Sequence, residues 1–280
     1  MGISKQDFEY VSGLAHSQAA IVLEPGKEYL VENRLGALAK KEGFASIDEL
    51  VGRMRSEPKI NGLHHRAIDA LTTNETLFFR DHHPFDALRR FVLPNVIAQR
   101  AGVRHLSIWS AACSTGQEPY SLAMLLREYF PELGGWSVSI LGTDLSPSVL
   151  EKARRAEYSQ FEVNRGLPAN YLVKYFAQRG DHWRVRDEIR GMVEFRPMNL
   201  IEPWPVLLPF DVICLRNVMI YFDVETKKTI LKRIRNCLLP HGCLVLGTAE
   251  TTTNLDLGYQ PVTHGKAVVY HPLPGPAAAD

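Results

Sequence analysis

Small residues and one acid follow the apolar run Leu106–Trp109. The segment Ser110–Ser121 reads SAACSTGQEPYS, with its small-residue turn from Ala111 to Gly116 and a carboxylate at Glu118. Small side chains let a ligand approach the backbone, and the start of the following helix offers unpaired N–H groups. A dinucleotide site would show G-x-G-x-x-G, and Glu118 would repel a diphosphate. The turn therefore favours a ligand with a cationic end, such as a methionine-derived sulfonium, although a purely structural strand-to-helix turn is the alternative.

Polar side chains also follow three further apolar runs. Asp144 comes directly after Val138–Thr143 and is placed to accept both ribose hydroxyls of an adenosine, unless it only caps the helix that begins near Ser146. Asn199–Leu200 and Leu215–Asn217 follow the next two runs. Strand ends of this kind line the crevice where open α/β sheets bind ligands, so Asn199 is a candidate for reading the adenine edge. Asn is also an ordinary loop residue, and that alternative stays open.

A mostly parallel sheet is needed to bring these strand ends together. From about residue 84, apolar runs alternate with amphipathic stretches, as in an α/β domain whose sheet is covered by helices on both faces. The expected strands are Leu106–Trp109, Val138–Gly142, Val193–Pro197, Asp211–Leu215 and Leu244–Gly247, and the expected helices are Pro84–Arg100, Pro119–Tyr129, Ser146–Arg155 and Val224–Leu238. A turn-like stretch at Thr263–Lys266 predicts a closing antiparallel hairpin, which is typical of class I methyltransferases.

Other parts flank or interrupt this domain. Residues 1–72 carry apolar positions at helical spacing and predict a small domain of three or four helices. Residues 73–83 form a connecting segment, and residues 84–272 form the α/β domain. Short strand-like pieces within about 158–190 predict a small inserted β-subdomain. The tail 273–280, rich in Pro, Gly and Ala, is expected to fray.

The composition argues against several other classes of protein. Lys and Arg number 32 against 31 Asp and Glu, and the net charge of +1 is too small to neutralise a nucleic-acid backbone. The 4 cysteines lack C-x-x-C spacing and the 10 histidines lack H-E-x-x-H, so no metal site is expected. The absence of a G-x-S-x-G elbow disfavours a hydrolase. No apolar run reaches the length of a membrane span, and we expect a cytoplasmic protein without membrane insertion.

Four motifs follow one another along the chain. They are TNETLFFR at Thr73–Arg80, CSTGQEPYS at Cys113–Ser121, GTD at Gly142–Asp144 and RNVMIYF at Arg216–Phe222. Together they resemble the CheR family of chemotaxis-receptor glutamate methyltransferases over nearly the whole chain, although residues 1–72 match in pattern rather than in motif. The sequence departs from the family's usual residues at two places. Gln117 stands where Glu is commoner, and Gly247–Glu250 reads GTAE in place of a GHSE-like string, so the role of that loop stays open.

The resemblance implies S-adenosylmethionine as the cofactor and S-adenosylhomocysteine as the product. The residues that it implies for cofactor binding are Asn74, Thr76, Arg80, Glu118, Asp144, Asn199, Leu200, Leu215, Arg216 and Asn217. Within this set, Glu118 would hold the methionine moiety. Arg80 and Tyr221 match positions near the reaction centre and are the catalytic candidates. The alternative for Arg80 is a salt bridge that ties the connecting segment to the core.

The implied reaction is methyl transfer to glutamate side chains of methyl-accepting chemotaxis receptors, which gives glutamate methyl esters. The partner is then the cytoplasmic signalling domain of a receptor, recognised by the helical domain, and we expect a monomer. Only Ala177–His182 separate Phe176 from Trp183, which is shorter than the loop that binds a receptor's C-terminal pentapeptide in some family members. We therefore expect no tethering. The alternatives are a methyltransferase with another acceptor, RNA or a small molecule, and a non-catalytic module that binds S-adenosylmethionine.

Overall fold

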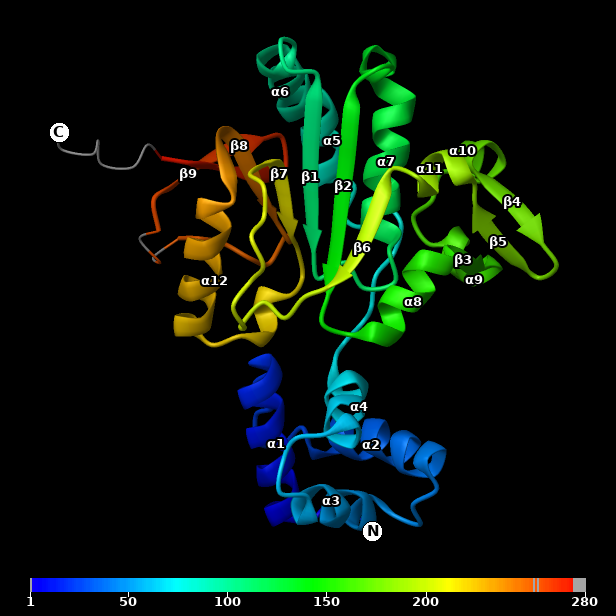
Figure 1. Cartoon of the computed structure of the whole chain (residues 1–280), viewed down its shortest axis with the longest axis vertical. Coiled ribbons are helices and arrows are strands. Elements are labelled where there is room, and N and C mark those ends of the chain that lie inside the picture. The colour runs from blue at the N-terminus through cyan, green and yellow to red at the C-terminus, as the bar shows by residue number, and fades with distance from the viewer. Residues whose placement is uncertain (1, 254, 256, 274–280) are drawn as a thin grey trace. The chain divides into compact units, whose positions relative to one another are not determined.

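The computed structural model describes residues 2–253, 255 and 257–273, so the predicted tail 273–280 lies outside the described residues except for Leu273. The chain divides into two compact units (Figure 1). The helical unit comprises Met1–Thr73, Asn199–Pro203 and Tyr221–Thr226, and the sheet unit comprises Asn74–Met198, Trp204–Ile220 and Lys227–Asp280. Within the described ranges, no helix has both the length and the apolar character needed to cross a bilayer.

Four helices make up most of the helical unit. They are α1 (Lys5–Ala19), α2 (Glu28–Glu42), α3 (Ile47–Ser56) and α4 (Gly62–Leu71). The hydroxyls of Ser4 and Ser46 accept the N–H groups of Asp7 and Glu49 and so begin α1 and α3, while α2 ends at Gly43 in a left-handed conformation. α2 packs against α3 and α4, and α1 packs against α4. Their shared core consists of fully buried side chains, among them Val11, Leu35, Leu50, Val51 and Met54.

The described residues of the sheet unit form a seven-stranded sheet in the order β6-β2-β1-β7-β8-β10-β9 (Figure 1). The strands are β1 (His105–Ala111), β2 (Ser137–Asp144), β6 (Val193–Pro197), β7 (Phe210–Leu215), β8 (Leu238–Leu246), β9 (Tyr259–His264) and β10 (Ala267–Pro272). β1 pairs in parallel with β2 and β7, while β10 pairs antiparallel with β8 and β9. The predicted parallel sheet with an antiparallel end is therefore confirmed, and the carboxyl ends of β1, β2 and β7 lie side by side.

Helices pack against this sheet and position its strand ends. They include α5 (His83–Ala87), α6 (Leu93–Arg100), α7 (Gln117–Tyr129), α8 (Pro147–Arg155) and α12 (Val224–Asn236). The helix expected at Pro84–Arg100 contains a π-helical turn at Leu88–Val92, where the N–H of Leu93 reaches the carbonyl of Leu88. Pro94 explains this departure, because proline has no N–H to donate and its ring would clash with the carbonyl four residues earlier in a regular helix.

The predicted β insertion lies between α8 and β6. Its elements are β3 (Glu157–Ser159), α9 (Gln160–Asn164), α10 (Ala169–Tyr175), β4 (Phe176–Arg179), β5 (His182–Val185) and α11 (Asp187–Arg190), with antiparallel strands in the order β3-β5-β4. Arg179 pairs with His182, so only Gly180 and Asp181 connect β4 to β5. Phe78 from the connecting segment packs edge-on against Tyr158 and Phe176, with ring centroids 5.0 and 5.6 Å apart. The insertion thus shares its core with the segment that precedes α5.

Candidate functional site

The turn between β1 and α7 has a strained backbone. Ala112 and Ser114 have φ values of 56° and 50°, and Gly116 has φ of 93°. A side chain at Gly116 would place its Cβ only 3.0 Å from the Cβ of Ala153, so a glycine is needed for this close approach to α8. Left-handed residues other than glycine cost about 1–3 kcal/mol each and cluster at ligand-binding sites. The turn from Ala111 to Gly116 is therefore tightly packed against α8, and the approach of a ligand to its backbone stays a prediction.

Asp144 holds this turn from the end of β2. Its Oδ2 accepts the N–H of Ser114 at 2.8 Å, and its Oδ1 accepts the N–H of Ser146 at 3.0 Å. The cap of α8 is Ser146, whose hydroxyl accepts the N–H of Val149. The alternative that Asp144 serves only as the helix cap is thus wrong. Its carboxylate, 8% exposed, lies at the carboxyl edge of the sheet beside the β1 turn.

Glu118 lies in the first turn of α7 and has a partner on each carboxylate oxygen. Oε1 accepts the hydroxyl of Ser110 at 2.7 Å, and Oε2 accepts Nη1 of Arg216 at 2.8 Å. The sequence pointed to Glu118 as an acid available to a cationic ligand, whereas the folded chain already pairs it with its own guanidinium. Carboxylate oxygens have further lone pairs, so these contacts leave room for another donor.

Arg216 joins three parts of the sheet unit. Its Nη2 donates to the carbonyl of Arg80 at 2.8 Å and to Oδ2 of Asp81 at 2.9 Å, while Nη1 binds Glu118. Burial is the largest single effect and lowers the pKa of Arg216, but the charges of Glu118, Cys214 and Asp81 and the hydrogen bond to Glu118 together raise the pKa above its usual value. Two acids face one guanidinium, so the cluster keeps one net negative charge. Arg216 therefore links α7 and the connecting segment to the end of β7, and its contact with the cofactor stays a prediction.

The connecting segment is bent sharply beside this cluster. Phe79, Asp81 and His82 have φ values of 50°, 69° and 47°. Arg80 lies between them and donates from Nη1 to the carbonyl of Glu75 at 2.9 Å. The alternative role expected for Arg80 was a salt bridge between the connecting segment and the core. That salt bridge is formed instead by its neighbour Asp81, which binds Arg216.

The other predicted residues are divided between the two units. In the sheet unit, the carbonyl of Asn74 accepts the hydroxyl of Ser114 at 2.8 Å, and Thr76 follows it half-buried. Leu200 is buried and is assigned with Asn199 and Tyr221 to the helical unit. There the amide of Asn199 donates to the carbonyl of Gln18 at 2.8 Å and to Glu202 at 3.0 Å. The role of Asn199 in reading adenine stays a prediction.

Three residues absent from the sequence prediction contact the site residues. The contact of Ser110 with Glu118 was not predicted, because it depends on the position of Ser110 in β1. Asp81 follows Arg80 directly but carries no signal of its own until Arg216 is placed. Glu250, 8% exposed, accepts the N–H groups of Asn217, Val218, Met219 and Gly247 at 2.7–2.9 Å. The only indication of the Glu250 contacts in the sequence was that Gly247 and Glu250 match the family's GHSE-like string.

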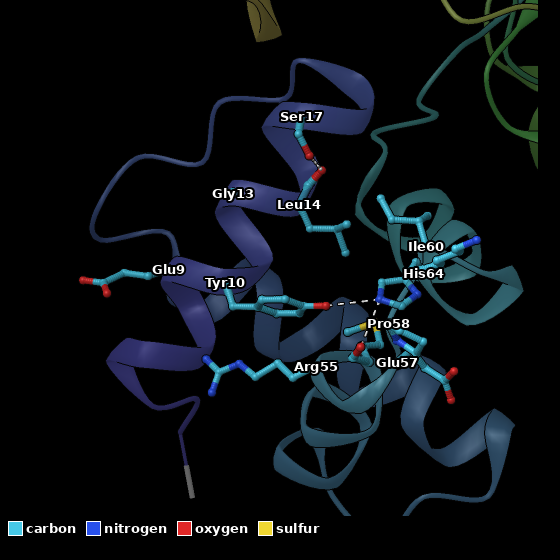
Figure 2. A pocket seen from close by; sticks show the side chains of 12 residues that line it. Glu9, Tyr10, Gly13, Leu14, Ser17, Arg55, Glu57, Pro58, Ile60 and His64 are labelled. Carbon is cyan, nitrogen blue, oxygen red and sulfur yellow. Dashed lines mark hydrogen bonds between the residues drawn. The ribbon is translucent and has the colours of Figure 1, made fainter.

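A separate hollow of about 460 Å³ lies within the helical unit between α1, α3 and α4. Figure 2 shows Tyr10 pointing from α1 toward His64, with its hydroxyl 3.1 Å from Nε2. Burial raises the pKa of Tyr10, and Arg55 partly offsets that effect. His64 accepts the N–H of Asn61 on Nδ1 at the start of α4 and contacts the carbonyl of Met54 with Nε2, so its ring links α4 to α3. Glu9 and Glu57 line the hollow together with Arg55 and Lys59, so its acids and its permanent cations are equal in number.

No group of three or more metal-ligating side chains is present among residues 2–253, 255 and 257–273.

Comparison with known proteins bears on what the carboxyl-edge acids do. Residues 74–267 match the family model of the CheR methyltransferase SAM binding domain, and residues 6–72 match that of the CheR methyltransferase all-alpha domain.

Similar proteins match over almost their whole length. Chemotaxis protein methyltransferase 1 of Pseudomonas aeruginosa is 42% identical over 274 residues, which cover 96% of this chain and 99% of that protein. Chemotaxis protein methyltransferase Cher2 of Pseudomonas putida is 40% identical with the same coverage. The chemotaxis protein methyltransferase of Escherichia coli is 36% identical over 91% of this chain and 88% of its own length.

Proposed function

Because the chain belongs to the CheR family of S-adenosylmethionine-dependent methyltransferases, we propose that it methylates glutamate side chains of chemotaxis receptors. The products are glutamate methyl esters and S-adenosylhomocysteine. The observation that carries this proposal within the fold is the pair of buried carboxylates, Glu118 and Asp144, at the carboxyl edge of neighbouring parallel strands. Ligands of open α/β sheets bind at this edge, next to the strand where the sheet order reverses.

The residues of the carboxyl edge fit S-adenosylmethionine. The net negative charge shared by Glu118, Asp81 and Arg216 suits the ammonium group of the methionine moiety. Asp144, held by two backbone N–H groups, suits the ribose hydroxyls. The left-handed turn brings backbone atoms close to the ligand. We further propose that Asn74, Thr76, Asn199, Leu200, Leu215 and Asn217 complete the binding surface.

The cofactor supplies an electrophilic methyl group, so the chain's own residues have a limited task. A receptor glutamate with a pKa near 4.3 is ionised at pH 7, and no general base is required. Arg80 and Tyr221 are proposed to align the incoming carboxylate and replace part of its water shell. Arg80 serves better in positioning than in stabilising the transition state, because the charge of the carboxylate is lost as the new bond forms.

The test is incubation with tritiated S-adenosylmethionine and receptor signalling fragments, followed by alkali treatment. Carboxyl methyl esters hydrolyse in alkali, so the expected label on the receptor fragment is base-labile. Asp144→Asn, which removes the proposed ribose acceptor, should abolish labelling and serves as the control. Alkali-stable label on RNA would overturn the receptor as acceptor, and S-adenosylhomocysteine binding without any transfer would favour a non-catalytic module.

We also propose that the protein acts in the cytoplasm as a monomer and does not tether to a receptor's pentapeptide. The two-residue connection Gly180–Asp181 supports the last point, because it leaves no long loop between β4 and β5. Calorimetry with a receptor C-terminal pentapeptide should give no heat of binding, and micromolar binding would contradict this part of the proposal. The division into residues 1–72, 73–83 and 84–272 is likewise kept as a proposal.

A further inference from the structure

The loop after β8 returns a carboxylate to the loop after β7. Glu250 accepts the N–H groups of Val218 and Met219 on Oε1, at 2.9 and 2.7 Å, and those of Asn217 and Gly247 on Oε2, at 2.7 and 2.8 Å. Three of these donors are consecutive in sequence. One side chain therefore fixes the whole segment Asn217–Met219, which directly follows a predicted cofactor-binding strand end.

The backbone of that segment is shaped for an anion. Asn217 has φ of 59°, and a left-handed residue of this kind turns successive N–H groups toward a common point. Hydrogen bonds from N–H groups to a carboxylate are about twice as strong as those between neutral groups. Without Glu250, these N–H groups would lack their charged acceptor at a place that is mostly shielded from water.

Gly247 makes room for this carboxylate. A Cβ on Gly247 would lie 2.6 Å from Oε2 of Glu250 and 2.9 Å from the backbone nitrogen of Asn217. Thr248 and Ala249, which lie between Gly247 and Glu250, are exposed. Thr248 and Ala249, where the GTAE sequence differs from the family's usual one, thus make none of these contacts. The retained residues Gly247 and Glu250 contact each other.

The segment held by Glu250 adjoins the rest of the site. Arg216 precedes Asn217 directly, and its guanidinium binds Glu118 and Asp81. The chain between Leu215 and Met219 is consequently fixed on both sides, by Arg216 toward α7 and the connecting segment, and by Glu250 toward the end of β8. A displacement of Asn217 would propagate to Arg216 because the two residues share a peptide bond.

We propose that Glu250, with Gly247 as its necessary neighbour, is a positioning residue that holds the Leu215–Asn217 segment in the conformation that receives the cofactor. The inference rests on the proposed function for the identity of the ligand. It assigns to the loop Gly247–Glu250 a role in cofactor affinity that is exerted through the backbone of Asn217–Met219, without direct contact between Glu250 and the ligand.

Glu250→Gln tests this assignment, because glutamine keeps the shape but turns an amide NH₂ toward two N–H donors. We expect the dissociation constant for S-adenosylhomocysteine, measured by calorimetry, to rise about tenfold to a hundredfold. In turnover, the KM for S-adenosylmethionine should rise while the KM for the receptor fragment is unchanged. Amide hydrogen exchange of the peptide containing Asn217–Met219 should accelerate in the free protein, a readout that needs no ligand.

Two controls separate positioning from general loss of stability. Asp211→Asn removes a buried carboxylate at the opposite end of β7 and should lower the melting temperature without changing the affinity of the folded protein. Thr248→Ala changes an exposed residue of the same loop and should change neither quantity. Gly247→Ala, which displaces the carboxylate without removing it, should reproduce the weak binding of Glu250→Gln and covers the case in which that variant does not fold.

The outcomes distinguish this inference from the proposed function. Unchanged affinity and unchanged amide exchange in Glu250→Gln would overturn the positioning role, even if the wild type methylates receptor fragments. Equal weakening of binding by Glu250→Gln and Asp211→Asn would also overturn it, since a loss shared by both ends of β7 is one of stability. A wild type that binds S-adenosylhomocysteine but labels no receptor contradicts the proposed function, and the affinity difference between the variants then still decides the role of Glu250.

Discussion

The parallel strands of the seven-stranded sheet have buried acids at both their amino ends, called here the amino edge, and their carboxyl ends, the carboxyl edge. The two edges use these acids differently. At the amino edge, Asp211 is 0% exposed, accepts the N–H of Ser107 at 2.8 Å, and lies 3.2 Å from Arg100 and 2.9 Å from His241. It binds a neighbouring strand, the guanidinium of Arg100 and the imidazole of His241. At the carboxyl edge, Asp144 and Glu250 accept N–H groups of loops that follow strands.

At the carboxyl edge, strained backbone lies close to such acids. Ala112, Ser114 and Asn217, all left-handed, follow β1 and β7 at the carboxyl edge and are each held by, or next to, an acid's hydrogen bond. An acid that binds strands adds stability to the sheet as a whole. An acid that binds a strained loop fixes one local conformation, which is what a binding site requires.

The largest effect is expected at the carboxyl edge, in Glu118→Gln. The change leaves Arg216 paired with Asp81 alone and removes the negative charge proposed to attract the ammonium group of the cofactor. Calorimetry should show affinity for S-adenosylhomocysteine falling about a hundredfold, or about 3 kcal/mol. Circular dichroism should show a folded protein, and undiminished affinity in that protein would remove Glu118 from the site.

A second change tests the amino edge. Asp211→Asn removes the buried counter-charge of Arg100 and the carboxylate that contacts His241, and we expect about 2 kcal/mol of lost stability, or about 5 °C in Tm. Thermal unfolding measures this loss, and calorimetry below the transition should find the affinity for S-adenosylhomocysteine of the folded protein unchanged. Weaker binding would break the distinction between the two edges.

The smallest effect concerns pH at the amino edge. Burial lowers the pKa of His271, a hydrogen bond from its Nδ1 to the carbonyl of Gly242 partly offsets this, and His264 lowers it further. The unfolded chain therefore binds the proton more readily, so stability falls as the pH drops below about 6.5 toward the pKa of the folded state. Tm measured between pH 7 and pH 5 should fall less steeply in His271→Asn, and an identical slope in both proteins would exclude this contribution.

Much of the carboxyl edge could be predicted because its signals are local. Apolar runs followed by Gly116, Glu118 or Asp144 predicted both the parallel strands and the loops at their ends. The partners of these acids could not be predicted in the same way. Arg216 lies 98 residues from Glu118 and 135 from Asp81, and only the tertiary fold brings them together.

The π-helical turn at Leu88–Val92 shows an intermediate case. The helix was predicted over Pro84–Arg100 from its apolar spacing, which does not show how Pro94 interrupts the regular backbone hydrogen bonds. Glu250 was missed for a different reason. Its acceptor role depends on the left-handed conformation of Asn217, which an asparagine permits but does not require.

The order of strands also has a consequence for how the chain folds during synthesis. β1 lies between β2 and β7, and β7 pairs with β8 on its other side. The middle of the sheet therefore joins strands that are far apart in the sequence and are synthesised at different times. Contacts of such long sequence separation form late, because the chain must lose loop entropy before they stabilise it. The helices α1 to α4 can form early from nearby residues, whereas the acids of the carboxyl edge are all present only when Glu250 has been made. A growing chain therefore becomes able to hold the cofactor only late in its synthesis, once Glu250 can bind the loop after β7.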